Sequence, residues 1–355
     1  MADVRWSGIR LTGLWAAVPS ARGTTADLTL RFGAVEARRI AENTGVLERR
    51  LAPPGVCASD LCFEAAANLL RSLAWDPKSV DALVFVSQTP DFALPATACC
   101  LQHRLGLPTG CAAFDVQLGC SGYVYGLWLS GSLLRSGAAR RVLLLVGDTM
   151  SQLLGPSDRA TVPLFGDAGT ATALEAAPDD GHAWTINLGT DGAGFAHLNV
   201  PGGRFRHPTS EASRARTERE AGNIRSDEDL FMNGAEVFAF TLREVPRLVK
   251  GILSASGRTA AEVDHFVFHQ ANGFMLRTLA KKIGLPADKL VLGLKRYGNT
   301  SSGSIPLAMV TELEARLRSG PATLLLAGFG VGWSWGAAVI ETPALLSIGF
   351  TEFEP

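Results

Sequence analysis

Apolar residues in this chain gather in short continuous runs, and the stretches between the runs carry apolar positions at helical spacing. The runs 82–86 (ALVFV) and 142–146 (VLLLV) are strand-sized and show no alternation with polar residues. Such runs are typical of strands buried on both faces, in sheets that helices cover. They fall far short of the roughly 20 apolar residues that a membrane span requires. The pattern predicts an α/β fold.

The chain also repeats itself once, at an offset of about 180 residues, and such a repeat is a strong guide to architecture. Four elements recur in the same order: VDALVFVSQ from Val80 as VDHFVFHQ from Val263, RLGLP at 104–108 as KIGLP at 282–286, SGYVYGLWLSGSLLRSG from Ser121 as SGSIPLAMVTELEARLRSG from Ser302, and VLLLVGD from Val142 as TLLLAGF from Thr323. Each half therefore reads as strand, helix, strand, helix, strand. We expect two halves, 1–180 and 181–355, packed about a pseudo-twofold axis.

The polar segment 204–230 interrupts this pattern and is too long for an ordinary connection. It is rich in Arg, Glu, Ser and Asp, and it has apolar anchors at both ends. It is either a lid over a site or a solvated flap, and the anchors favour an ordered lid.

Composition narrows the possible functions. The 355 residues are 47% hydrophobic and 19% charged, enough to fill a large core. The net charge of −1 gives no overall field that would draw the protein to nucleic acid or to an anionic membrane. The N-terminus does not resemble a signal peptide, and the six cysteines show no CxxC spacing, so we expect reduced thiols in a cytoplasmic protein.

Cys120 differs from the other cysteines in its setting. It lies in DVQLGCSGY, between an apolar strand that ends near Val116 and a helix that begins just after the thiol. Unpaired backbone N–H groups at a helix N-terminus stabilise a thiolate, so this position predicts a nucleophile with a lowered pKa. A buried structural cysteine is the plainer alternative.

Two polar loops of the second half complete the candidate site. His269 lies in VFHQAN, just after an apolar strand, and Asn299 lies in RYGNTSSGSIP, before a predicted helix. The repeat places Asn299 close to the position that Cys120 has in the first half. A lone histidine after a strand is more often structural, but the three residues together predict one site. The glycine-rich run 327–336 (AGFGVGWSWG) follows the last buried strand and can supply oxyanion-hole N–H groups. It lacks the GxxxxGK[ST] of a phosphate cradle.

These motifs, together with PSDRATVPLFGDAGTA at 156–171, resemble the ketoacyl-acyl carrier protein synthase III family over nearly the whole chain. The resemblance implies a five-layered α-β-α-β-α thiolase fold and a homodimer. It also implies that Leu94 helps to close the partner's acyl pocket.

The resemblance further implies the chemistry. Cys120 would take an acyl group from a thioester, and the N–H groups of Cys120 and Val331 would receive the oxyanion. His269 and Asn299 would bind a malonyl thioester and stabilise the enolate formed as carbon dioxide leaves. The product is a 3-oxoacyl thioester, in fatty-acid initiation or a related specialised pathway. No cofactor or metal is implied, since acyl-coenzyme A is a substrate.

Binding residues follow from the same resemblance. Arg159 and Asn272 are substrate-binding positions, and Arg39 and Asn43 stand near places where the family often has a Trp and an Arg for coenzyme A. Arg39 and Asn43 thus differ from the residues with which the family usually binds coenzyme A. The family's carrier protein is acidic, and a basic patch for it is expected on the helix after HQAN, at Arg277, Lys281 and Lys282. A solvated helix face is the plainer reading of these three residues.

Other functions remain open. An acyltransferase or thioester hydrolase would use acyl-Cys120 with an alcohol, an amine or water, but has less need of His269 and Asn299. A non-catalytic dimerisation or carrier-binding protein would not need the whole set. A thiolase would require a second cysteine in the run 327–336, which has none, and a hydroxymethylglutaryl-type synthase would require an assignable carboxylate base beside Cys120.

Overall fold

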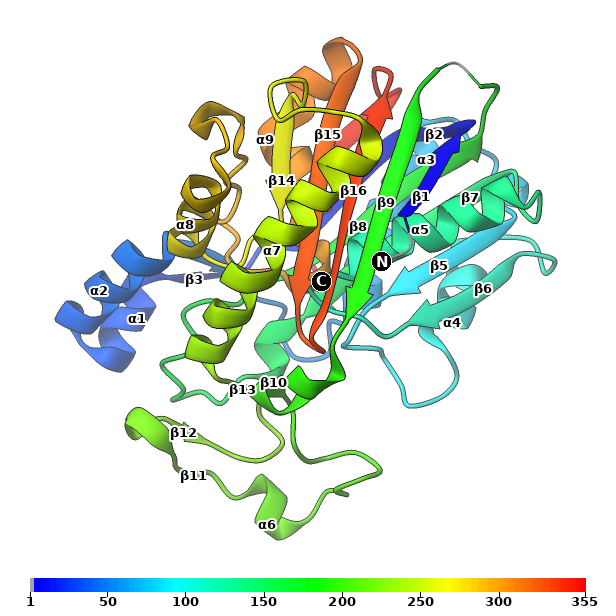
Figure 1. The fold of residues 1–355 in the computed structure, drawn as a ribbon. Helices are drawn as coiled ribbons and strands as arrows, with labels where there is room; N and C mark the ends of the chain where they lie inside the picture. The colour runs from blue at the N-terminus through cyan, green and yellow to red at the C-terminus, as the bar shows by residue number, and fades with distance from the viewer. Residues whose placement is uncertain (1–2, 180) are drawn as a thin grey trace.

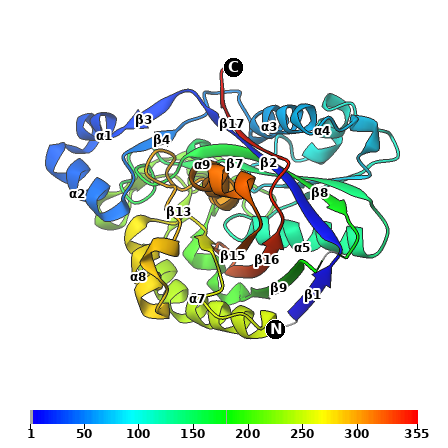
Figure 2. The ribbon, with the colours of Figure 1, turned by 90° about the horizontal axis from the view of Figure 1, so that it is seen from above.

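The computed structural model describes residues 3–179 and 181–355, in which helices and sheets alternate in five layers (Figures 1 and 2). The first sheet has the strand order β17 (Ser347–Phe353), β2 (Ile9–Pro19), β8 (Asp167–Ala176), β7 (Arg141–Thr149), β5 (Ala82–Val86), β6 (Ala112–Val116). The second has the order β1 (Asp3–Ser7), β9 (Ala183–Thr190), β16 (Ser334–Thr342), β15 (Ala322–Gly330), β14 (His265–Phe268). The predicted thiolase-like α-β-α-β-α architecture is confirmed.

Three pairs of helices separate and cover the sheets, as Figure 2 shows from above. The outer face of the first sheet carries α3 (Ala58–Ser72) and α4 (Thr97–Arg104), the space between the sheets holds α5 (Gly122–Arg135) and α9 (Ser304–Ser319), and the outer face of the second sheet carries α7 (Gly234–Ser256) and α8 (Gly273–Ile283). A further pair, α1 (Thr25–Phe32) and α2 (Ala34–Thr44), connects the paired short strands β3 (Arg22–Thr24) and β4 (Glu48–Arg50).

Burial of both sheet faces explains the apolar runs in the sequence. All five residues of β5 are buried, and so are all residues of β7 except Arg141. Between the sheets, α5 has apolar and small buried residues around much of its circumference, as expected for a helix with no solvent-facing side.

The repeat corresponds to equivalent positions in the two sheets. In the first sheet β7 lies between β8 and β5, and in the second β15 lies between β16 and β14. The repeated segments that begin at Ser121 and Ser302 form the two central helices, α5 and α9. A sixth strand is missing from the second sheet in the described residues, where a single bridge between Phe266 and Leu290 takes its place.

The chain ends cross between the halves. β1 comes from the first half and pairs with β9 in the second sheet, while β17 comes from the last residues and pairs with β2 in the first sheet. The proposed division falls at residue 180, which lies outside the described residues. Each sheet therefore contains one strand from the other half of the sequence.

The segment 204–230 has its own secondary structure. It contains α6 (Glu211–Arg214) and a small hairpin of β11 (Thr217–Glu218) and β12 (Ile224–Arg225), and it extends at the bottom of Figure 1. Ile224 forms a bridge with Ser157, and the Asn223 side chain accepts a hydrogen bond from the Arg159 N–H. The segment thus packs on the loop that carries Arg159. The short strands β10 (Leu198–Asn199) and β13 (Phe231–Met232) pair with each other on either side of it.

Within the described residues, no helix combines the length and apolar character that crossing a membrane would require.

Candidate active site

Cys120 lies at the centre of the molecule, between β6 and the first turn of α5, as the sequence predicted. Its side chain is buried, with 7% of the residue exposed. The glycine loop after β15 closes over it. A Cβ built on Gly330 would stand 2.7 Å from the Cys120 sulfur, so this position leaves no room for a side chain.

The predicted lowering of the Cys120 pKa is wrong. Burial raises the pKa of this thiol to about 11, because the surrounding protein solvates a thiolate less well than water does. Hydrogen bonds from the backbone of Val331 and Cys120 and from the Ser301 side chain act in the opposite direction but do not cancel the effect of burial. The position of Cys120 at the N-terminus of a helix was predicted correctly, but its burial could not be predicted from the sequence.

His269 directly follows β14, the strand equivalent to β5 of the first half. Its backbone N–H donates to the carbonyl of Ala327 on β15, which fixes the residue against the neighbouring strand. The ring Nδ1 lies 2.8 Å from the Ser304 hydroxyl at the start of α9. Burial lowers the pKa of His269 to about 4, and the Ser301 backbone opposes this only partly. The imidazole is therefore neutral at pH 7.

Asn299 precedes α9 and is held by residues 164–166, which follow the PSDRAT motif. Its backbone N–H donates to the Leu164 carbonyl at 2.9 Å, and its own carbonyl accepts from the Gly166 N–H at 3.1 Å. The side-chain Oδ1 accepts from the Ser301 N–H at 2.9 Å, which fixes the amide orientation. The Nδ2 group lies on the other side, where one N–H points to the Ala271 carbonyl at 3.5 Å and a second N–H can donate to a substrate.

One narrow cavity of about 70 Å³ brings the three predicted residues together. Cys120, His269 and Asn299 all line it, with apolar side chains from Phe165, Leu198, Met232 and Phe329 among its walls. The cavity therefore combines a thiol, a neutral imidazole and a primary amide in apolar surroundings. Apolar walls strengthen electrostatic interactions with a developing negative charge.

The oxyanion-hole prediction concerns Cys120 and Val331. A hydrogen bond links the Val331 backbone to the Cys120 thiol, and the Val331 carbonyl accepts from the Ser334 hydroxyl at 2.8 Å. Ser334 in turn lies 2.7 Å from the Ser121 hydroxyl, at the start of α5. These contacts link the glycine loop to α5, the helix that follows Cys120.

The predicted substrate-binding residues occupy three different settings. Asn272 lines the Cys120 cavity and caps α8 by accepting the Met275 N–H at 2.8 Å. Arg159 is exposed on its loop. Arg39 and Asn43 are exposed on α2, where Arg39 pairs with Glu36, and Leu94 is 80% exposed. Of these, only Asn272 is among the residues that line the cavity.

The predicted carrier-binding residues share one exposed surface of α8. Arg277, Lys281 and Lys282 are all exposed, and none pairs with a carboxylate in the described residues. The C-terminal turn of α2 lies against the N-terminus of α8, since a Cβ on Gly45 would stand 3.7 Å from Gly273. Arg39 and Asn43 therefore lie on the helix next to this basic surface (Figure 1).

The sequence did not predict the network behind the site. Asp148, at the end of β7, is fully buried and accepts from the Ser302 hydroxyl at 2.6 Å and the Gln88 N–H at 2.8 Å. Burial raises its pKa, against the effect of these hydrogen bonds. Gln88 also donates to the Ser301 hydroxyl at 2.9 Å. The run 300–304 (TSSGS) predicted only a turn, so the hydrogen bonds of its hydroxyls could not be predicted from the sequence.

The segment 204–230 lines no part of the Cys120 cavity in the described residues. Its two end residues, Arg204 and Leu230, line a neighbouring cavity instead. The segment packs outward on the Arg159 loop, and its assignment as a lid or a flap stays a prediction.

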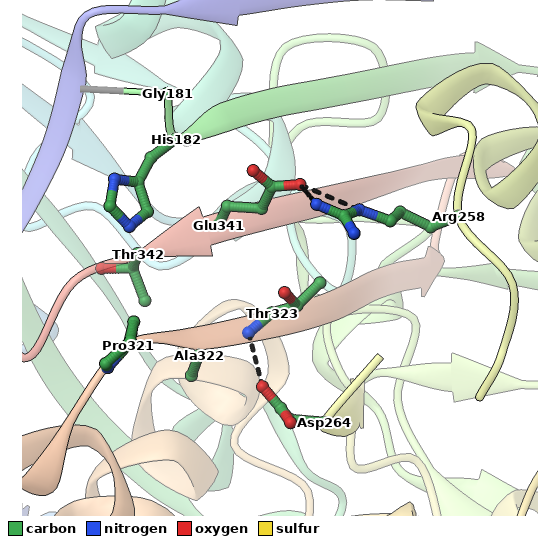
Figure 3. A pocket seen from close by; sticks show the side chains of 9 residues that line it. All are labelled: Gly181, His182, Arg258, Asp264, Pro321, Ala322, Thr323, Glu341 and Thr342. Carbon is green, nitrogen blue, oxygen red and sulfur yellow. Dashed lines mark hydrogen bonds and ion pairs between the residues drawn. The ribbon is translucent and has the colours of Figure 1, made fainter. Parts of the chain in front are cut away.

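A separate polar hollow lies at the opposite end of β15 and β16 from Gly330 (Figure 3). In it Arg258 pairs with Glu341, and Asp264 accepts the Thr323 N–H at 2.8 Å. These groups already bond to one another and are remote from the thiol. Among residues 3–179 and 181–355, no group of three or more His, Cys, Asp or Glu is placed to hold a metal ion.

Comparison with known proteins identifies the family of this chain. Residues 114–192 match the family described as 3-oxoacyl-[acyl-carrier-protein (ACP)] synthase III, and residues 253–342 match its C-terminal part. The beta-ketoacyl-[acyl-carrier-protein] synthase III of Desulfitobacterium hafniense strain Y51 is 35% identical over 303 residues, which cover 85% of this chain and 88% of that protein. The protein of the same name from Neisseria meningitidis serogroup C strain FAM18 is 32% identical, over 94% of this chain and 98% of its own length.

A solved structure extends the likeness to the whole fold. The 3-oxoacyl-(acyl-carrier protein) synthase of Burkholderia xenovorans LB400 superposes with a TM-score of 0.94 at 46% identity and covers 99% of both chains. The thiolase fold and the names of these relatives place the chain among the condensing enzymes. This chain belongs to the beta-ketoacyl-acyl carrier protein synthase III family.

Proposed function

We propose that this enzyme works through an acyl group carried on Cys120. The thiol attacks the carbonyl of an acyl-coenzyme A, the new bond to sulfur forms, and coenzyme A leaves as the free thiol. The N–H groups of Val331 and Cys120 receive the negative charge of the tetrahedral intermediate. The contact between the Val331 backbone and the thiol supports this assignment.

A malonyl thioester is the second substrate in this proposal. His269 and Asn299 donate hydrogen bonds to its thioester carbonyl and stabilise the enolate that forms as carbon dioxide is lost. The enolate carbon attacks the acyl-Cys120 carbonyl, a carbon–carbon bond forms, and the bond to the cysteine sulfur breaks. The product is a 3-oxoacyl thioester, and Cys120 recovers its thiol.

The mechanism requires a particular form of His269. A neutral imidazole donates from only one nitrogen, so Nε2 must carry the proton if it is to face the substrate. Nδ1 then accepts a hydrogen bond from the Ser304 hydroxyl, 2.8 Å away. The low pKa of His269 supports this role, because a neutral ring donates a hydrogen bond without holding the enolate intermediate as an ion pair.

The extender is proposed to arrive on acyl carrier protein, as the names of the curated relatives indicate for those proteins. The exposed residues Arg277, Lys281 and Lys282 would receive its acidic surface. Arg159, Arg39 and Asn43 are proposed to contact coenzyme A, and no other cofactor is needed. The pathway is fatty-acid initiation or a related specialised pathway.

A homodimer is part of the proposal. β6 is the edge strand of the first sheet and is partly exposed, and an unpaired edge favours pairing with another chain. Phe92 and Leu94, in the loop after β5, are 56% and 80% exposed. A second copy that covers these side chains would bring Leu94 to its partner's acyl pocket.

The shared cavity of Cys120, His269 and Asn299 is the observation that carries this proposal. It is tested by Asn299→Asp, which keeps the side-chain shape but replaces the N–H donors. Carbon dioxide release from malonyl-acyl carrier protein should fall by a hundredfold or more, as for other oxyanion donors. Acylation of Cys120 by acetyl-coenzyme A should stay within a few-fold of the parent enzyme. Unchanged carbon dioxide release would contradict the role of Asn299, and no carbon dioxide release by the parent enzyme would favour the acyltransferase or hydrolase alternative.

A further inference from the structure

A cavity of about 350 Å³ lies beside α1, at the end of the molecule where Figure 1 shows α1 and α2. Its walls come from β3, α1 and the segments 49–51 and 151–162, and it shares no lining residue with the Cys120 cavity. Val162 lines this cavity, whereas Leu164 and Phe165 line the cavity of the thiol. The short segment 162–165 therefore separates the two.

Three arginines line this cavity, and two of them have no carboxylate partner. Arg22 pairs with Glu48 at 3.5 Å and with Glu352 at 3.3 Å. Arg31 and Arg49 form no ion pair within the described residues, and each donates one hydrogen bond to a backbone carbonyl of the segment 151–162. A guanidinium has five N–H donors, so most of the donors of Arg31 and Arg49 have no acceptor in the protein.

Arg49 is a buried cation whose free donors face the cavity. Only 5% of the residue is exposed, and its Nη2 lies against the cavity-lining Gly23, where an added Cβ would stand 2.7 Å away. Nε and Nη2 make no hydrogen bond in the described residues, yet they are not sealed off as the Nε of Arg50 is. Burial and then the charge of Arg31 lower the pKa of Arg49 to about 10, so the side chain is still charged at pH 7. A buried cation without a counterion is costly, and a bound anion recovers that cost.

Asp27, in the first turn of α1, determines which anion fits. It lines the cavity, and its Oδ2 accepts hydrogen bonds from the Thr24 N–H at 2.6 Å and the Thr24 hydroxyl at 2.8 Å. These hydrogen bonds hold the pKa of Asp27 below its usual range, so the carboxylate is ionised at pH 7. An ionised carboxylate repels a fully ionised oxyanion but accepts a hydrogen bond from one that keeps a proton. Inorganic phosphate keeps at least one O–H at pH 7, and sulfate has none.

We propose that this cavity is a binding site for inorganic phosphate. Arg31 and Arg49 donate to its charged oxygens, since guanidinium groups match the geometry of phosphate, and Asp27 accepts from its O–H group. A phosphate monoester, such as the 3′-phosphate of coenzyme A, is largely a dianion at pH 7 and has no O–H to offer Asp27. The site is therefore distinct from the proposed coenzyme A contacts.

Isothermal titration calorimetry of the full-length enzyme at pH 7 tests this site. The enzyme is prepared without phosphate and titrated with sodium phosphate or sodium sulfate at one low ionic strength. Phosphate should bind about tenfold more tightly than sulfate or better, because only phosphate satisfies Asp27. Equal affinities, tighter binding of sulfate, or no heat at millimolar phosphate would overturn the proposal.

Two variants and a matched control assign the binding to these side chains. Arg31→Gln should weaken phosphate binding about tenfold, whereas Arg140→Gln, at an exposed arginine that does not line the cavity, should leave it unchanged. Asp27→Asn keeps an oxygen for the Thr24 hydrogen bonds but adds N–H donors, so sulfate should then bind as tightly as phosphate. Thermal melting establishes that the variants fold, and the comparison of anions on the parent enzyme stands without them. Unchanged phosphate binding in Arg31→Gln would overturn the assignment.

A kinetic experiment separates this site from coenzyme A binding. Saturating phosphate should leave KM for acetyl-coenzyme A in Cys120 acylation within about twofold, as for two sites without strong coupling. A competitive rise in KM would assign the cavity to coenzyme A and overturn the proposal. Because calorimetry requires no acyl transfer, the phosphate site and the proposed function can fail independently.

Discussion

Cys120 and His269 both have pKa values that favour their neutral forms. Burial is the largest cause in each case: it raises the pKa of the thiol to about 11 and lowers that of the imidazole to about 4. A site of two neutral groups differs from a thiolate–imidazolium pair, in which each charge would stabilise the other. At pH 7 the nucleophile is a thiol that must lose its proton as it attacks.

The raised pKa of Cys120 predicts how the free enzyme reacts with iodoacetamide. Because the thiolate is a small fraction well below pH 11, the alkylation rate of Cys120 should rise about tenfold for each pH unit between pH 6.5 and 9.5. Peptide mapping separates Cys120 from the exposed Cys99, which serves as an internal control. A plateau below pH 8 would contradict the raised pKa.

Ser304 is a positioning residue for His269. Ser304→Ala removes the hydroxyl that lies 2.8 Å from Nδ1, so the ring loses the contact that favours a proton on Nε2. Carbon dioxide release should fall about tenfold, whereas acylation of Cys120 should change little.

The tautomer of His269 is a readout that a merely structural role of Ser304 would leave unchanged. ¹⁵N NMR of histidine-labelled enzyme at pH 7 should show His269 neutral with its proton on Nε2, and Ser304→Ala should shift the population toward Nδ1. A protonated ring, or an Nδ1–H ring in the parent enzyme, would be inconsistent with the proposed donor.

At the scale of elements, the close approach of β15 to α5 determines access to the thiol. Gly330→Ala would place a methyl group 2.7 Å from the Cys120 sulfur and displace the Val331 N–H. Acylation should slow by a hundredfold or more. A matched control is Gly320→Ala, between α9 and β15, where an added Cβ would meet no atom within 4 Å. Equal acylation rates in the two variants would show that the glycine loop does not limit the site.

The basic surface of α8 predicts a selective effect on the carrier substrate. Lys281→Glu should raise KM for malonyl-acyl carrier protein about tenfold at low salt, because it reverses a charge that faces an acidic partner. Its effect on acetyl-coenzyme A acylation should be small. Lys78→Glu, an exposed change beside the first sheet, is the control. If both variants respond alike, α8 is a solvated face and not a docking surface.

At the scale of the whole molecule, the apolar runs and their repeat predicted two α/β halves, and the five layers followed from the resemblance to the synthase III family. The sequence could not predict that β1 and β17 exchange sheets, since the short segment 3–7 (DVRWS) carries no pattern that specifies its partner strand. The proximity of Cys120, His269 and Asn299 was predictable from the repeat and from loops at strand ends. The pKa of Cys120 and the hydroxyls of Ser301 and Ser304 were not, because burial and contact depend on packing between the halves.

The proposed homodimer makes a prediction about Leu94. Light scattering should give twice the chain mass of 37.5 kDa. Because Leu94 is 80% exposed, Leu94→Ala should leave the thermal stability of each subunit unchanged. It should nevertheless raise acylation by octanoyl-coenzyme A relative to acetyl-coenzyme A several-fold, if the side chain closes the partner's pocket. A monomer, or a dimer with unaltered chain-length preference, would refute this assembly.

The central claim is that Cys120 carries the acyl group and delivers it to a carbon nucleophile. The most direct measurement is intact-mass spectrometry of the enzyme after acyl-coenzyme A, and again after malonyl-acyl carrier protein. The account predicts a mass gain that maps to Cys120, is absent in Cys120→Ala, and disappears as 3-oxoacyl-acyl carrier protein forms. An adduct discharged only by water, an alcohol or an amine, or no adduct with any donor, would contradict it.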